Sequence, residues 1–130
     1  MIKHSTEVAE KYAVKLKYDS SGLIPAIVQD SEKNVLMLAY MDEEAVKRTL
    51  ASGQMWYYSR SRKAYWLKGE TSGHFQEVLE VNRDCDSDTL LFTIEQTGWA
   101  CHEDFYSCFH YQLQQGGKEV VVGENFREGK

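Results

Sequence analysis

The chain has 130 residues, of which 42% are hydrophobic and 27% charged, and a net charge of −5 at pH 7. These values predict a single globular domain over 1–130 with a buried core. The acidic balance argues against nucleic-acid binding, which usually needs a basic surface. No apolar stretch approaches the roughly 18 residues of a membrane span, and the first twenty residues lack the apolar segment of a signal peptide. Three cysteines, an odd number, suit free thiols in a reducing compartment. We therefore expect a cytoplasmic protein with no membrane partner.

Strand patterns dominate the chain. A lead-in at 1–20 contains a possible helix at 7–16, and a clear helix is expected at 43–52, started by Asp42 as N-cap and ended near Gly53. A turn at Gly116-Gly117 lies in the tail at 115–130 and leads into 119–123. Strands are expected at 23–29, 35–41, 55–59, 64–67, 75–82, 89–96 and 108–113. The fold class is therefore α+β, a mainly antiparallel sheet with one or two short helices.

The segment Asp84-Cys85-Asp86-Ser87-Asp88 combines a thiol with three carboxylates, and Cys101-His102 and Cys108 follow it. Thiolate suits zinc, while carboxylate oxygens suit magnesium, calcium or manganese. This mixture favours two neighbouring metal sites of different character. By spacing alone, three buried cysteines that act as small apolar residues are an equal alternative.

The conformation of this acidic segment decides which side chains can share a metal. An EF-hand loop is excluded because Thr89 stands where the sharp turn requires Gly. If the segment stays extended, its side chains alternate. We then expect Asp84, Asp86 and Asp88 on one side and Cys85 on the other, so that one segment serves a hard cation and zinc.

Three thiolates leave a four-coordinate zinc one ligand short, and an open position distinguishes catalytic from structural zinc sites. An open zinc lowers the pKa of its bound water to about 7, which suits hydrolysis at an electrophilic carbon. His102 follows Cys101 directly and is the candidate for orienting or deprotonating that water.

A basic stretch precedes the metal motifs. Basic side chains, hydroxyls and glycine-freed backbone amides favour phosphate groups, although a solubilising turn is the simpler reading of the charges alone. The candidate substrate-binding residues are Arg60, Arg62, Lys68, Glu70, Thr71 and Ser72. We expect an anionic substrate.

From about residue 23 to 109 the chain resembles the phosphoribosyl-AMP cyclohydrolases of histidine biosynthesis. The motifs that carry the resemblance are Leu36-Met37-Leu38-Ala39-Tyr40-Met41, Tyr58-Ser59-Arg60-Ser61-Arg62, Trp66 with Lys68-Gly69-Glu70-Thr71-Ser72-Gly73, Asp84-Cys85-Asp86-Ser87-Asp88, and Ala100-Cys101-His102 with Ser107-Cys108-Phe109. The resemblance implies hydrolysis of the N1–C6 bond in the adenine ring of 1-(5-phosphoribosyl)-AMP, which gives the ProFAR intermediate.

The resemblance also implies the cofactors and the assembly. Zn²⁺ is expected on Cys85, Cys101 and Cys108, and Mg²⁺ on Asp84, Asp86 and Asp88. An intertwined homodimer is expected, in which one subunit contributes Cys85 and its partner the other two cysteines. Catalysis would involve His102, and the basic stretch would hold the two phosphates of the nucleotide.

Several positions depart from the family pattern: Trp99, His74, His110 and the segment Glu103-Asp104-Phe105-Tyr106. The acidic Glu103-Asp104 pair suggests an alternative hypothesis, in which the chain is a related zinc hydrolase that acts on a different substrate. A third hypothesis is a non-catalytic binding module in which zinc only stabilises the fold. That site would need a fourth protein ligand, for which His102 or His110 are candidates.

Overall fold

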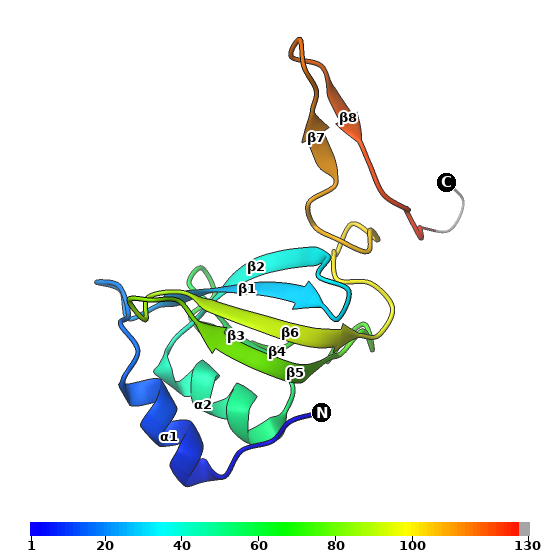
Figure 1. Cartoon of the computed structure of the whole chain (residues 1–130). Helices are drawn as coiled ribbons and strands as arrows, with labels where there is room; N and C mark the ends of the chain where they lie inside the picture. Colours follow the sequence, from blue (N-terminus) through cyan, green and yellow to red (C-terminus); the bar gives the residue numbers. More distant parts are fainter. Residues whose placement is uncertain (128–130) are drawn as a thin grey trace.

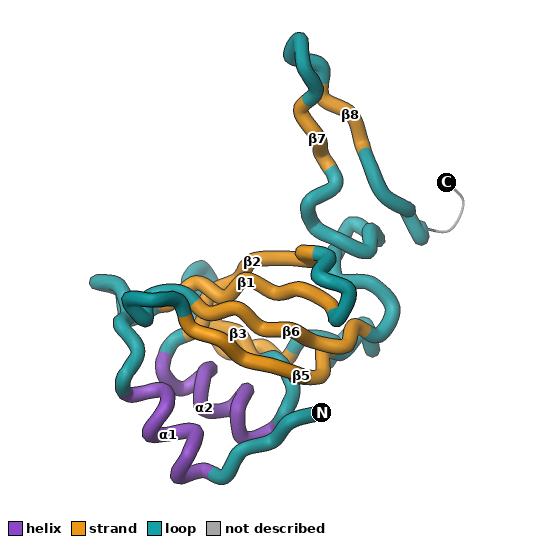
Figure 2. The backbone as a smooth tube through the Cα atoms, viewed as in Figure 1, coloured by secondary structure: helices purple, strands orange, loops and turns teal. Residues whose placement is uncertain are grey.

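The computed structural model describes residues 1–127, so the last three residues of the expected tail lie outside the described part. Figures 1 and 2 show a sheet with two helices on one side and a separate hairpin above it. The elements are α1 (Thr6–Val14), β1 (Ile24–Asp30), β2 (Val35–Met41), α2 (Glu43–Ser52), β3 (Trp56–Ser59), β4 (Ala64–Leu67), β5 (Gln76–Arg83), β6 (Leu90–Gln96), β7 (Tyr111–Leu113) and β8 (Glu119–Val121). The predicted α+β class with short helices is confirmed.

The main sheet has the strand order β2-β1-β6-β5. It consists of two antiparallel hairpins, β1–β2 and β5–β6, which meet through a parallel pairing of β1 with β6 that aligns Ala26 with Leu90. Asp30 closes the β1–β2 turn, because its carboxylate accepts hydrogen bonds from the backbone N–H groups of Glu32 and Asn34. The sheets are mainly antiparallel, as expected, and the central parallel pair is the exception.

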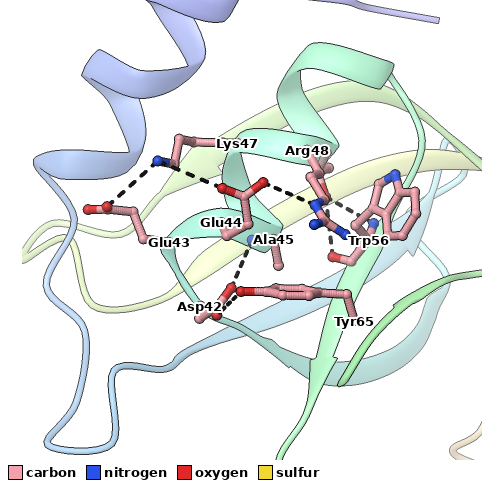
Figure 3. A network of polar contacts seen from close by, with 9 residues as sticks. Asp42, Glu43, Glu44, Ala45, Lys47, Arg48, Trp56 and Tyr65 are labelled. Carbon is pink, nitrogen blue, oxygen red and sulfur yellow. Dashed lines mark hydrogen bonds and ion pairs between the residues drawn. The ribbon is translucent and has the colours of Figure 1, made fainter. Parts of the chain in front are cut away.

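Local sequence explains helix α2. The Asp42 carboxylate accepts a hydrogen bond from the Ala45 N–H at 2.8 Å and another from the Tyr65 hydroxyl at 2.6 Å (Figure 3). At the other end Gly53 adopts the left-handed conformation (φ 76°) that ends a helix at little cost. Arg48 lies over the Tyr65 ring, 4.3 Å from its centroid. The helix is thereby tied to the β3–β4 hairpin.

The core lies between the helices and the sheet. Helices α1 and α2 pack side by side, and the β3–β4 hairpin packs against α2 and β2 (Figure 1). The predicted buried face of α2 is confirmed, with Ala45, Val46, Thr49 and Leu50 all buried. Tyr57 and Phe92 are the largest fully buried side chains in the described chain. No helix within residues 1–127 is long and apolar enough to cross a membrane.

The β7–β8 hairpin stands away from the sheet (Figure 2), and its apolar side chains are exposed, Tyr111 by 58% and Leu113 by 72%. The predicted strand at 108–113 was too long at its start, since β7 begins at Tyr111. Cys108 instead lies in the preceding loop, where its N–H donates to the carbonyl of Leu36 at 2.7 Å. This bond anchors the loop to the edge strand β2.

Candidate metal centre and substrate site

The acidic segment forms the turn between β5 and β6, so the condition of an extended segment, on which the expected alternation of its side chains depended, is not met. Ser87 has a left-handed conformation (φ 65°), and its N–H donates to the carbonyl of Asp84. The Asp84 carboxylate accepts from the N–H groups of Asp88 at 3.0 Å and Thr89 at 3.3 Å. These local hydrogen bonds can form only when the segment turns, so they stabilise the tight turn relative to an extended conformation.

The turn nevertheless brings the three carboxylates together. One oxygen each from Asp84, Asp86 and Asp88 lies within 4.8 Å of the others, and all three residues are exposed. Residual desolvation acts to raise the pKa of Asp84, but hydrogen bonds from Asp88 and Thr89 outweigh it and lower that pKa. The pKa of Asp88 is raised by its hydrogen bonds to Asp84 and Asp86 and by their negative charge. Such a group of oxygens suits a hard divalent cation.

Cys101 and Cys108 lie together in the loop after β6. Cys101 is only 5% exposed, Cys108 is half-buried, and the two thiols are close enough for each to affect the charge of the other. A turn from Cys101 to Phe105 fixes this loop, with backbone hydrogen bonds of 3.0 and 3.1 Å at the Cys101 backbone. Burial raises the pKa of Cys108 to about 11, and the neighbouring Cys101 adds to the rise. A cation is therefore needed to hold this thiol as the thiolate that binds metals.

Lys68 supplies one positive charge beside these thiols. Its half-buried ammonium donates to the carbonyl of Ala100, immediately before Cys101. Burial lowers the pKa of Lys68, while the proximity of Cys108 and Cys101 acts in the opposite direction. Lys68 thus links the β3–β4 hairpin to the cysteine loop and lowers the cost of thiolate there.

Cys85 lies far from the other two cysteines within one chain. It is exposed in the turn before β6, whereas Cys101 follows the far end of that strand (Figure 1). Seven residues of strand at about 3.3 Å per residue separate the two ends by roughly 20 Å. The structure therefore brings together two of the three predicted zinc ligands and leaves Cys85 at the opposite end of the sheet.

The predicted substrate-binding residues are divided in the same way. The exposed residues Arg60 and Arg62 lie in the β3–β4 turn, and the Arg60 guanidinium lies 5.0 Å from the centre of the Tyr40 ring. Tyr40 pairs with the start of β1, which lies beside the start of β6 and the acidic turn. Arg60 thus lies at the same end of the sheet as the aspartates.

The other half of the basic stretch lies at the cysteine end. A cavity of about 240 Å³ is lined there by Lys68, Ser72, His74, Trp99, Cys101 and His102, among others. His102, the predicted catalytic residue, is exposed at this cavity next to the buried Cys101. Glu70 and Thr71 are exposed in the loop after β4 that also carries Ser72.

A cluster of metal-donor side chains around Cys101 was not predicted from the sequence. One ligand atom each from Cys101, Glu103 and His110 lies within 4.8 Å of the others. The sequence suggests His110 as a possible fourth zinc ligand, but it marks Glu103 only as an acidic departure from the family pattern. The signal available was the Cys-x-Glu spacing, which puts both side chains in one short turn.

The other departures from the family pattern contact one another. Trp99 donates from Nε1 to the Asp104 carboxylate at 3.1 Å, and the His74 ring packs edge-on against Trp99. From the tail, Phe126 stacks on Trp99 at 4.9 Å, and Arg127 forms an ion pair with Asp104 at 3.1 Å. The tail therefore packs on the cysteine loop through contacts between these residues, and the sequence alone did not predict those contacts.

Comparison with known proteins gives consistent results. The family model described as phosphoribosyl-AMP cyclohydrolase matches residues 37–110. The chain is 61% identical to a phosphoribosyl-AMP cyclohydrolase of Pelotomaculum thermopropionicum over 110 residues, 84% of this chain and 85% of the relative. It is 58% identical to one from Methanocaldococcus jannaschii over 103 residues, 79% and 81% of the two chains. A relative of that name from Methanococcus maripaludis is 46% identical over 125 residues, 95% and 97%.

Proposed function

The chain belongs to the phosphoribosyl-AMP cyclohydrolase family, a family of hydrolases, and we propose that it catalyses that reaction in histidine biosynthesis. The substrate is 1-(5-phosphoribosyl)-AMP, and the bond that is hydrolysed joins N1 to C6 of the adenine ring. Water supplies an oxygen to C6, the C6–N1 bond breaks, and N1 gains a proton. The reaction uses zinc at Cys85, Cys101 and Cys108, and magnesium at Asp84, Asp86 and Asp88.

The division of the site residues between the two ends of one sheet is the observation that carries this proposal. Asp84, Cys85 and Arg60 lie at one end, while Cys101, Cys108 and His102 lie about 20 Å away at the other. A two-fold homodimer would place one end of each chain against the opposite end of its partner. Two complete sites would result, each using Cys85 from one subunit with Cys101 and Cys108 from the other.

The cysteine end fits zinc. Two adjacent thiols, one buried and one half-buried, lie beside the Lys68 ammonium, and the Glu103 N–H donates to Cys101 Sγ at 3.4 Å. Zinc bound there would act as a Lewis acid and would lower the pKa of a water ligand to about 7. Three protein thiolates leave the position that such a water requires.

The residues of the chain supply positioning and proton transfer. His102, at the cavity beside Cys101, would take up the proton that the water loses and return it toward N1. Lys68 and Ser72 line the same cavity and would bind one phosphate, while Arg60 and Arg62 of the partner subunit would bind the other. Basic side chains at both ends of the sheet therefore suit a substrate with two phosphate groups.

The direct test is hydrolysis of 1-(5-phosphoribosyl)-AMP by the purified protein loaded with zinc and supplied with magnesium. We expect turnover that is lost when zinc is removed by a chelator and restored when it is added back. An absence of turnover with both metals present would contradict the proposal and would favour a shifted substrate or a binding module.

Complementation tests the shared site. Cys85→Ser and Cys101→Ser chains should each be inactive alone, since each damages every site of its own homodimer. After unfolding and refolding as an equimolar mixture, half of the dimers would be mixed, and each would carry one intact site. We expect about one quarter of the parent activity. If the mixture is as inactive as its components, the site is not shared between subunits.

A further inference from the structure

Three different donor atoms converge near the cysteine loop within a single chain. They are Cys101 Sγ, a carboxylate oxygen of Glu103 and an imidazole nitrogen of His110, all within 4.8 Å of one another. Cys101 is 5% and His110 3% exposed, and the Glu103 side chain is 46% exposed. A sulfur, a nitrogen and an oxygen donor are the set that borderline cations such as zinc bind.

The His110 ring is held as metal-binding histidines are held. Its Nδ1 lies 3.1 Å from the carbonyl of Ser107, and this carbonyl can only accept a hydrogen bond, so Nδ1 carries a proton. The ring is stacked on Phe105 at 3.8 Å with an angle of 6° between the planes. Its orientation is thus fixed from two directions, and Nε2 points at Glu103, 3.1 Å from Oε1. A histidine that binds metal through one nitrogen usually donates from the other to a carbonyl or carboxylate.

The contact between Nε2 and Glu103 requires a positive ion between the two atoms, either a proton or a metal ion. With Nδ1 protonated, neutral His110 presents a lone pair at Nε2 to a carboxylate oxygen, and two lone pairs at 3.1 Å repel each other. A proton would relieve this repulsion for these two groups alone. A metal ion would also engage the buried Cys101 sulfur, which already accepts the N–H of Glu103. The presence of the third donor favours the metal.

We propose that Cys101, Glu103 and His110 of one subunit form a metal site that holds a zinc-type divalent cation without help from the partner's Cys85. This inference rests on the proposed function only for the role of Cys101 in zinc binding. According to this inference, a single chain binds a metal ion beside Cys108 before a dimer completes the shared site. Three protein ligands leave the fourth position of a tetrahedral ion available to Cys108 or to water.

The test titrates the metal-free full chain with Zn²⁺, and with Co²⁺ as a spectroscopic probe of thiolate ligation and tetrahedral geometry. His110→Phe keeps a ring on Phe105 but removes the nitrogen donor, and Glu103→Gln removes the charge with little change of shape. Both should lower zinc affinity at least about tenfold. Loss of a residue that only supports a metal ligand already costs about 10- to 100-fold in affinity, so loss of a direct ligand should cost no less than the lower value. Asp104→Asn, which removes the same charge from the next residue, is the matched control and should bind zinc like the parent.

The Cys85→Ser chain separates this inference from the shared site. It should still bind one ion per chain and give the thiolate-to-cobalt absorption. If Cys85→Ser instead abolishes metal binding while His110→Phe and Glu103→Gln bind like the parent, the inference is overturned. Should His110→Phe fail to fold, as thermal unfolding of the metal-free chain would reveal, Glu103→Gln decides. All these readouts are independent of turnover, so an inactive parent that binds zinc as described would contradict the proposed function alone.

Discussion

At the scale of single residues, Cys101 occupies the central position. It is buried, it lies near Cys108, and it belongs to the donor cluster with Glu103 and His110. Lys68 and the Glu103 N–H surround it with positive charge and a hydrogen-bond donor. The proposed shared zinc site and the proposed single-chain metal site of Cys101, Glu103 and His110 therefore both depend on this one thiol.

Cys101→Ser should remove zinc and activity together, because a hydroxyl at this position is a far weaker zinc ligand than a thiolate. Metal content per chain and hydrolysis of 1-(5-phosphoribosyl)-AMP are the measurements. A fully active Cys101→Ser enzyme would rule out the proposed zinc chemistry.

Asp86→Asn should act on magnesium and leave the turn intact. The backbone N–H groups of the acidic turn donate to the carboxylate and the carbonyl of Asp84, so Asp86 can be changed without losing these hydrogen bonds. We expect the magnesium concentration for half-maximal activity to rise, with the zinc content unchanged. If Asp86→Asn leaves the magnesium dependence as in the parent, the cation does not bind to this carboxylate.

Asp30 should make the stability of the protein depend on acid pH. Burial acts to raise its pKa, but hydrogen bonds from Asn34, Tyr106 and Glu32 outweigh this and lower the pKa below 3.8. Asp30→Asn should cost about 1–3 kcal/mol at neutral pH, since these donors lose a charged acceptor. A lowered pKa in the folded state stabilises the protein above the ordinary pKa and ceases to do so as the pH falls through the lowered value.

Urea unfolding over a series of pH values checks this prediction. The difference between the parent and Asp30→Asn should be full at neutral pH and should shrink as the pH falls below about 3.8. A difference that stays constant over this range would show that the ionised carboxylate is not the cause.

At the scale of elements, helix α2 depends on Asp42. This one carboxylate caps the helix through Ala45 and accepts the hydroxyl of Tyr65 from strand β4 (Figure 3). Burial and the hydrogen bond to Asp42 raise the pKa of Tyr65 to about 12. The cap therefore also holds the β3–β4 hairpin, which carries Lys68 at its end, against the helix.

Asp42→Ala should destabilise the fold by about 0.5–2 kcal/mol through the lost cap, and somewhat more through the lost Tyr65 contact. Asp42→Asn is the control, because asparagine caps helices about as well as aspartate. Thermal or urea unfolding of both variants measures the effect. Equal stability of Asp42→Ala and the parent would show that the cap contributes little in this protein.

At the scale of the whole molecule, the two ends of the sheet carry different halves of the proposed site, and the β7–β8 hairpin exposes Tyr111, Leu113 and Val121. Both features suit a protein that pairs with a second copy. Gel filtration with light scattering should give a mass of twice the 15.0 kDa of one chain. A mass near 15.0 kDa under assay conditions would contradict the shared site.

The sequence alone determined the local elements and the chemistry of the motifs. Helix α2 follows from Asp42 and Gly53, and the strands follow from alternating patterns, because caps, turns and periodicity depend on near neighbours. The aspartate, cysteine and histidine motifs likewise gave the expected metals and reaction through the family resemblance.

Only the tertiary structure decided where these residues lie relative to one another. The parallel pairing of β1 with β6 puts Arg60, whose guanidinium lies over Tyr40 opposite the start of β1, at the same end of the sheet as the acidic turn. The folding of the cysteine loop, which is anchored to β2 by the bond from the Cys108 N–H to Leu36, brings His110 to Cys101 and Glu103. Pairings between distant segments depend on the packing of the whole chain, and no pattern among sequence neighbours determines them.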